Sequence, residues 1–214
     1  MNFKLAIFDL DGTLMNTSPG IFASANAAME KLGFPPEHDV NQLSKFIGPP
    51  ITQCFVEVYN LEPSLIDEAI SLYRVEYDTH GRFNAHPYPG IPQLLSTLKN
   101  RGYLLAVGTL KYEKLAKQML EHFNLDGYFD SIRGADLDST LSKADIVNKV
   151  LKDLAVEAKD AVLIGDTYHD QKGAMDANVP FIAVDWGFGF PKGHPKDETT
   201  FAVVRSPEEL LTML

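Results

Sequence analysis

The chain has 214 residues, 45% of them hydrophobic and 22% charged, with no internal repeat or low-complexity tract. This length suffices for one substantial core, or for a core with a smaller second unit. The formal net charge of -10 at pH 7 argues against a surface for nucleic-acid polymers or anionic membranes, because such surfaces need clustered lysine and arginine.

Targeting and redox signals are sparse. The N-terminus lacks a signal-peptide pattern and the apolar runs are too short to span a bilayer, so we expect a cytoplasmic protein. The single cysteine, Cys54, excludes an internal disulfide framework. Within QCFVEVY it is expected to be a small buried hydrophobe rather than a nucleophile.

The first part of the chain holds one strand and then a helical region. Residues 3–9 (FKLAIFD) are typical of a buried strand that ends at a glycine turn. From residue 18 to about residue 80 the patterns are helical, with helices predicted over 19–33, 51–60 and 63–80.

After residue 88 helices and strands alternate. Helices are predicted over 91–101, 111–122, 143–154 and 170–177, and strands over 103–108, 129–134, 161–165 and 181–184. The run Ser206-Pro207-Glu208-Glu209 predicts a capping box that opens a last short helix. The alternation predicts an α/β fold, a Rossmann-like core with a mostly parallel sheet, made of residues 1–14 and 85–214. Residues 15–84 would form an inserted α-helical domain.

Polar side chains follow several of the predicted strands. They are Asp9 and Asp11, Thr109, and Asp166 with Asp170. Ligands of open α/β sheets bind outside the carboxyl ends of the strands, so these groups are expected to converge in one crevice. Carboxylates this close are either held apart in protonation or neutralised by a cation, and hard oxygen ligands together with a substrate phosphate suit Mg²⁺.

Two lysines point to an anion. Lys111 and Lys143 are both predicted at helix starts, where the helix dipole disfavours a cation unless an anion binds nearby. Since helix N-termini also offer free N–H donors, phosphate is the expected anion.

Four of these motifs are similar, in order and spacing, to those of the haloacid dehalogenase superfamily: FDLDGT at 8–13, Thr109 after its strand, Lys143 in SKADIV, and GDTYHD at 165–170. The resemblance covers nearly the whole chain, and the helical insertion resembles that superfamily's small α-helical cap. FIGPPI at 46–51, the run 88–111 and RGADLD at 133–138 resemble its phosphoglycolate phosphatase-like or 5′-nucleotidase-like branch.

The resemblance implies a Mg²⁺-dependent phosphatase that hydrolyses a small phosphomonoester through an aspartyl-phosphate. Asp9 would attack phosphorus, and Asp11 would protonate the leaving group and then activate water. Thr109 and Lys143 would bind phosphoryl oxygens and complete the catalytic set. The implied substrate-binding positions are Gly12, Thr13, Gly108, Leu110 and Lys111. The implied metal positions are Asp9, Asp11 through its backbone carbonyl, Asp166 and Asp170.

Several alternatives stay open at this stage. One alternative is a phosphomutase or a pyrophosphatase of the same superfamily. Another is a phospho-accepting signalling or binding protein without turnover. The alternative role for Asp170 is that of a helix cap without a part in metal binding. Leu110 departs from the Asn or Ser that relatives usually carry at this position. The expected partner is a small phosphorylated metabolite, phosphoglycolate or a nucleoside 5′-monophosphate, and the expected assembly is a monomer or a homodimer.

Overall fold

The computed structural model describes residues 3–49, 51–137, 140–190, 192–193 and 195–214. Pro50 and Asp138, which belong to two of the motifs above, lie outside the described residues. The chain divides into two compact units, Met1–Met15 with Pro87–Leu214, and Asn16–His86. Between them the chain passes through β2 (Met15–Asn16) and β3 (His86–Pro87), which form a two-stranded sheet.

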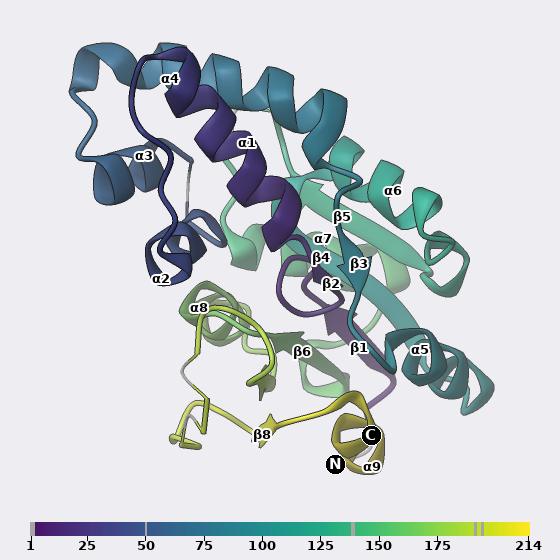
Figure 1. Cartoon of the computed structure of the whole chain (residues 1–214). Coiled ribbons are helices and arrows are strands. Elements are labelled where there is room, and N and C mark those ends of the chain that lie inside the picture. Colours follow the sequence, from purple (N-terminus) through teal and green to yellow (C-terminus); the bar gives the residue numbers. More distant parts are fainter. Residues whose placement is uncertain (1–2, 50, 138–139, 191, 194) are drawn as a thin grey trace. The chain divides into compact units, whose positions relative to one another are not determined.

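The larger unit is built on a six-stranded sheet in the order β5-β4-β1-β6-β7-β8, and every neighbouring pair is parallel. The predicted α/β fold with a mostly parallel sheet is confirmed (Figure 1). The strands are β1 (Leu5–Phe8), β4 (Leu104–Tyr112), β5 (Ser131–Ala135), β6 (Ala161–Gly165), β7 (Phe181–Val184) and β8 (Ala202–Val204).

Helices follow the strands on both faces of this sheet. Right-handed crossovers put α5 and α6 on one face and α7 and α8 on the other. In agreement, α7 packs against α8, while α5 packs against α9. The helices are α5 (Ile91–Asn100), α6 (Glu113–His122), α7 (Lys143–Leu154), α8 (Tyr168–Asp176) and α9 (Pro207–Met213), with 3-10 turns η3 (Asp126–Tyr128) and η4 (Ala158–Asp160).

The core of this unit lies on the sheet, and β1 is buried at every residue. Alternate residues of a strand point to opposite faces, so Leu5 and Ile7 share the α7 and α8 side with Val147 and Ala174. A continuous apolar run with no polar alternation is what a doubly covered parallel strand requires. The polar Asp9 therefore comes at the first position beyond a wholly apolar strand.

The smaller unit is helical, and no strand occurs among its described residues between 17 and 85. A cluster of aromatic rings fills its interior, with Phe46 packed edge-on against Phe55 and Phe55 against Tyr73. Its elements are α1 (Ser18–Lys31), α2 (Val40–Leu43), η1 (Ser44–Phe46), α3 (Ile51–Tyr59), α4 (Pro63–Glu76) and η2 (Tyr77–Gly81). The predicted helix over 63–80 thus changes to π-helical geometry in its last turn, η2.

Several predicted elements differ from the structure in their bounds, and one strand was not predicted. The strand predicted over 103–108 continues to Tyr112, because β4 keeps pairing with β5 beyond Gly108, and the next helix begins at Glu113 rather than Lys111. The helix predicted from Asp170 begins at Tyr168 because Thr167 caps it. Strand β8 was not predicted, since three residues with little apolar periodicity carry too weak a signal.

The predicted capping box at Ser206 is half present. The Ser206 side chain accepts a hydrogen bond from the Glu209 backbone N–H at 3.2 Å, as predicted. The Glu209 carboxylate, however, accepts from the backbone N–H of Arg205 at 2.7 Å instead of from that of Ser206.

Among the described residues, no helix combines the length and the apolar character that a membrane span requires. Cys54 is fully buried in α3, which confirms the interpretation of this cysteine as a small core residue.

The Cys54 thiol is expected to react slowly. Burial, and next the charge of Glu57, raise the pKa of this thiol to about 12. The thiolate is the reactive form, so the native chain should react with an aromatic disulfide reagent far more slowly at pH 8 than the urea-unfolded chain. Its rate should keep rising between pH 8 and 10, where that of the unfolded chain levels off. Equal rates for native and unfolded protein would contradict this.

Candidate active site

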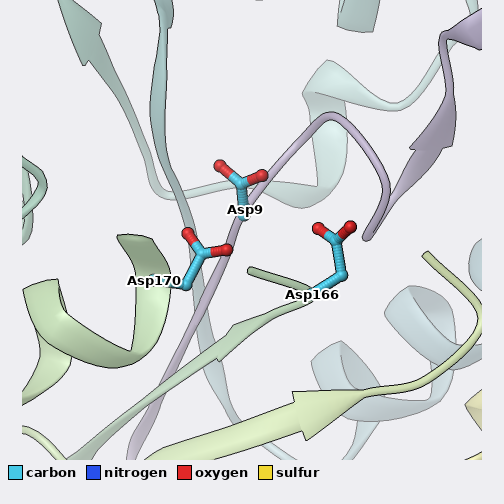
Figure 2. Close-up of side chains that lie close together, drawn as sticks. All are labelled: Asp9, Asp166 and Asp170. Carbon is cyan, nitrogen blue, oxygen red and sulfur yellow. The ribbon is translucent and has the colours of Figure 1, made fainter. Parts of the chain in front are cut away.

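Three buried carboxylates meet at the carboxyl edge of the sheet. Asp9 follows β1, Asp166 follows β6, and Asp170 lies in the first turn of α8 (Figure 2). Each offers an oxygen, and these oxygens all lie within 4.8 Å of one another. Because β1 and β6 are paired neighbours that end side by side, the two aspartates that follow them are brought together directly.

One lysine partly neutralises this cluster. Lys143, the first residue of α7, places its Nζ 2.7 Å from Asp9 Oδ1 and 2.5 Å from Asp170 Oδ1. Burial lowers the pKa of Lys143, but the two carboxylates outweigh burial, so its pKa is raised and the ammonium stays charged. The predicted helix start at Lys143 is confirmed, and Ser142 and Asp145 form a capping box there.

Lys143 alone does not keep all three carboxylates ionised, because burial favours the protonated forms of Asp9 and Asp166. Burial raises the pKa of Asp9 to about 7. The charge of Lys143 opposes this increase, and the charge of Asp170 adds to it. Burial, followed by the charges of Asp170 and Asp9, raises the pKa of Asp166 to about 8. With all three carboxylates ionised, one ammonium would leave an excess of two negative charges, which a divalent cation with oxygen ligands would match.

Asp11 lies two residues beyond Asp9 in a different environment. Both of its carboxylate oxygens lie 3.2 Å from the Nζ of Lys111, at the end of β4. Lys111 is therefore not at a helix start, and the predicted dipole argument is wrong for this residue; strand pairing carries the chain past it. Its ammonium serves instead as the partner of Asp11.

A tight turn separates the two aspartates from the rest of the loop. Gly12 has a φ of 84°, which favours glycine, and a Cβ there would lie 2.2 Å from Asp166 Oδ2. Thr13, next along, donates a hydrogen bond from its hydroxyl to Asp166 Oδ1 at 3.1 Å. The loop after β1 thus lies directly against the carboxylate that follows β6.

Asp170 has two sets of partners. Its Oδ2 accepts hydrogen bonds from the backbone N–H of Thr167 at 3.0 Å and from the Thr167 hydroxyl at 2.7 Å, which completes a capping box. Its Oδ1 contacts Lys143. The capping interpretation and the cluster interpretation of Asp170 therefore both describe this side chain.

The other predicted positions lie along β4. Gly108 packs against the buried strand β1, where an added Cβ would approach the Ile7 side chain at 3.1 Å. Thr109 is buried, and its hydroxyl oxygen accepts a hydrogen bond from the Lys111 backbone N–H at 3.2 Å. Leu110 follows on the same strand and is partly buried.

The resemblance to relatives places the run WGFG at 186–189 at the rim of the site, but sequence reasoning missed the contacts that this run makes around Asp166. Phe188 donates its backbone N–H to Asp166 Oδ2 at 2.8 Å, and Trp186 donates its indole N–H to the Thr13 carbonyl at 3.1 Å. Tyr88 packs edge-on against Trp186, and burial, followed by the charges of Asp166 and Asp11, raises the pKa of its phenol. The available signal was the glycine-rich run WGFG, which begins two residues after the end of the strand predicted over 181–184.

Comparison with known proteins agrees with this geometry. Residues 6–184 match the family model described as haloacid dehalogenase-like hydrolase. A 5′-nucleotidase of Pseudomonas aeruginosa is 37% identical over 190 residues, which cover 88% of this chain and 86% of the relative. A phosphoglycolate phosphatase of Aquifex aeolicus is 31% identical over 186 residues, which cover 86% of each chain.

A solved structure is similar over the whole chain. The crystal structure of a predicted phosphatase from Clostridium acetobutylicum has a TM-score of 0.89 and 37% identity, covering 100% of this chain and 98% of that one. The chain therefore belongs to the haloacid dehalogenase-like hydrolase family. Within that family it is a phosphatase.

Proposed function

We propose that this phosphatase hydrolyses a small phosphomonoester, phosphoglycolate or a nucleoside 5′-monophosphate, through a phosphorylated Asp9. The observation that carries the proposal is the separation of two neighbouring aspartates into different surroundings. Asp9 lies in the buried cluster with Lys143, whereas Asp11 is bound to Lys111. Groups in distinct environments can take distinct roles in acid–base and nucleophilic chemistry.

The first step is transfer of the phosphoryl group to Asp9. A carboxylate oxygen of Asp9 attacks phosphorus, the bond from phosphorus to the ester oxygen breaks, and Asp11 delivers a proton to that departing oxygen. Asp9 and Asp11 lie two residues apart in the loop after β1, so one is placed to reach phosphorus and the other the ester oxygen. The Lys143 ammonium, 2.7 Å from Asp9, favours the ionised nucleophile.

The second step returns Asp9 to its starting form. Asp11, now ionised, takes a proton from water as the water oxygen attacks phosphorus. The bond between phosphorus and the Asp9 oxygen breaks, and inorganic phosphate leaves. Thr109 and Lys143 hold the phosphoryl oxygens through their hydroxyl and ammonium donors during both steps.

Mg²⁺ fits the donor set of the cluster, which consists only of buried carboxylate oxygens with excess negative charge. Asp9, Asp166 and the backbone carbonyl of Asp11 would hold the ion, and Asp170 would support it. Held by these residues, the ion would neutralise charge on the phosphoryl group. The residues of the chain orient the ester and move its protons.

The substrate class follows from the named relatives and from the charge of the chain. The relatives include a 5′-nucleotidase and a phosphoglycolate phosphatase, both enzymes of small phosphate esters. A net charge of -10 disfavours polyanions, whereas a single phosphate needs only the local ammonium groups of Lys111 and Lys143.

Phosphate release from a substrate panel tests the proposal. The panel contains phosphoglycolate, nucleoside 5′-monophosphates, sugar phosphates, pyrophosphate and p-nitrophenyl phosphate, each with Mg²⁺ and with EDTA. We expect repeated turnover with Mg²⁺, little or none in EDTA, and the highest kcat/KM on phosphoglycolate or a nucleoside monophosphate. Preference for pyrophosphate, isomerised sugar phosphate without free phosphate, or one trapped phosphate per chain would each point to one of the alternatives.

A further inference from the structure

The glycine-rich run Trp186-Gly187-Phe188-Gly189, here called the 186–189 loop, follows β7 at the same edge of the sheet as the carboxylate cluster. It lies in the same compact unit as that cluster. Nothing in the proposed chemistry of Asp9 and Asp11 uses it. Its contacts nevertheless converge on one member of the cluster, Asp166.

The Asp166 carboxylate is held by three donors. The backbone N–H groups of Phe188 and Gly189 approach Oδ2 at 2.8 and 3.4 Å, and the Thr13 hydroxyl approaches Oδ1 at 3.1 Å. A carboxylate offers about four lone-pair positions. Three are therefore occupied from within the chain, and about one remains for a cation.

Two glycines permit this approach. Neither Gly187 nor Gly189 has a positive φ, so backbone conformation does not require glycine at either position. Space does: a Cβ on Gly187 would lie 2.3 Å from Asp166 Oδ2, and one on Gly189 would lie 2.6 Å from the Asp166 carbonyl oxygen. Contacts that short are not tolerated, so the glycines let the loop lie against Asp166.

The tryptophan closes the arrangement into a ring. Its indole N–H donates to the Thr13 carbonyl at 3.1 Å, the Thr13 hydroxyl donates to Asp166, and Asp166 accepts from Phe188 two residues beyond Trp186. The loop is thereby fixed to the segment that carries Asp9 and Asp11.

We propose that the 186–189 loop is a positioning element for the divalent cation, which presents Asp166 to the ion in one fixed orientation. The inference rests on the proposed function, because it assumes that the carboxylate cluster binds Mg²⁺. Partners that orient metal ligands commonly change metal affinity or activity by about 10- to 100-fold when they are removed. The loop touches Asp166 and Thr13, and it acts on the reaction only through them.

Mg²⁺ affinity, measured apart from turnover, tests this inference. Trp186 is the sole tryptophan of the chain, so its fluorescence reports on the loop directly. Titration of the full chain with Mg²⁺ should change that fluorescence with saturation, and Asp166→Asn should abolish the change. Gly187→Ala should require about 10- to 100-fold more Mg²⁺ for the same change.

Two further variants separate positioning from folding. Gly127 is exposed, has no positive φ and has no atom within 4 Å of an added Cβ, so Gly127→Ala is the matched control and should bind Mg²⁺ as the wild type does. Trp186→Phe keeps a ring beside Tyr88 but loses the N–H donor. Because this variant lacks the fluorescent side chain, its Mg²⁺ affinity is measured from the rise of the melting temperature with Mg²⁺ concentration. We expect Trp186→Phe to bind Mg²⁺ about 2- to 10-fold more weakly than the wild type.

The outcomes separate the two proposals. A Gly187→Ala chain that melts cooperatively and binds Mg²⁺ with wild-type affinity overturns the loop inference and leaves the metal assignment standing. If Gly187→Ala does not fold, wild-type Mg²⁺ affinity in Trp186→Phe likewise overturns the loop inference and leaves the metal assignment standing. A wild-type chain without saturable Mg²⁺ binding overturns the metal assignment itself, and with it the role given to the loop.

Discussion

Asp9→Asn is expected to lower turnover by at least about 10³-fold on every substrate, because an amide cannot replace the carboxylate that forms the bond to phosphorus. The substitution preserves shape and a hydrogen-bond acceptor for Lys143, 2.7 Å away, so the fold should persist. Steady-state phosphate release measures the first effect, and thermal melting measures the second.

Asp11→Asn is the matched control for Asp9→Asn. It removes a proton donor but not the nucleophile, so its effect should depend on the leaving group. With p-nitrophenyl phosphate, whose leaving group needs no proton, Asp9 should still be phosphorylated. Water is then poorly activated, and a single burst of nitrophenolate should precede slow turnover. Equal loss of kcat/KM on nitrophenyl and alkyl esters, with no burst of nitrophenolate, would contradict the acid–base role of Asp11.

Lys143→Met is expected to destabilise the chain by about 3–5 kcal/mol when measured in EDTA, because buried carboxylates lose their counter-charge. The Lys143 side chain is only 4% exposed and contacts both Asp9 and Asp170. Urea unfolding provides the free energy, and Mg²⁺ should restore part of it by supplying positive charge. Turnover should fall as well, since the ammonium next to the nucleophile is gone.

A surface ion pair provides the comparison for this experiment. Lys172 is 75% exposed and lies 2.6 Å from Asp176 on the same helix. Lys172→Met should change stability by no more than about 0.5 kcal/mol, as is usual for exposed pairs. A similar loss of unfolding free energy in Lys143→Met and Lys172→Met would show that burial does not make the ion pairs of Lys143 more stabilising than an exposed pair.

The carboxylate cluster was accessible from sequence because it follows from a general property of parallel sheets. Asp9 and Asp166 each come directly after an apolar strand, and strands that pair in parallel end at the same edge. Knowledge of the strands was therefore enough to predict that these two residues meet. Asp170 was harder, because its spacing fits helix capping as well as cluster formation, and the side chain does both.

Lys111 shows where local pattern fails. Lysine next to a run of helix-forming residues favours a helix start, but β4 continues to Tyr112 because β5 offers it a pairing partner. This pairing depends on β5, a segment more than twenty residues further along the chain. The residues immediately around Lys111 therefore carry no information about it. The ion pair between Lys111 and Asp11 could not be predicted from the local sequence for the same reason.

The 186–189 loop shows a second kind of failure. Its glycines are explained neither by positive φ nor by a turn motif, which are the reasons that sequence reasoning supplies for glycine. They are explained by Asp166, which lies twenty residues earlier and meets the loop only in the folded chain. The sequence therefore shows that glycines occur there, but not which distant side chain they approach.

The helical unit begins and ends at a single small sheet: the chain leaves through β2 and returns through β3, and these two strands are paired. An insertion whose two ends are held together places almost no constraint on the length or fold of what lies between them, since loop-closure entropy grows only slowly with length. The helical unit can therefore be remodelled or exchanged while the six strands and the carboxylate cluster keep their register. Changes to the helical unit and changes to the chemistry of the carboxylate cluster are thereby open to separate selection.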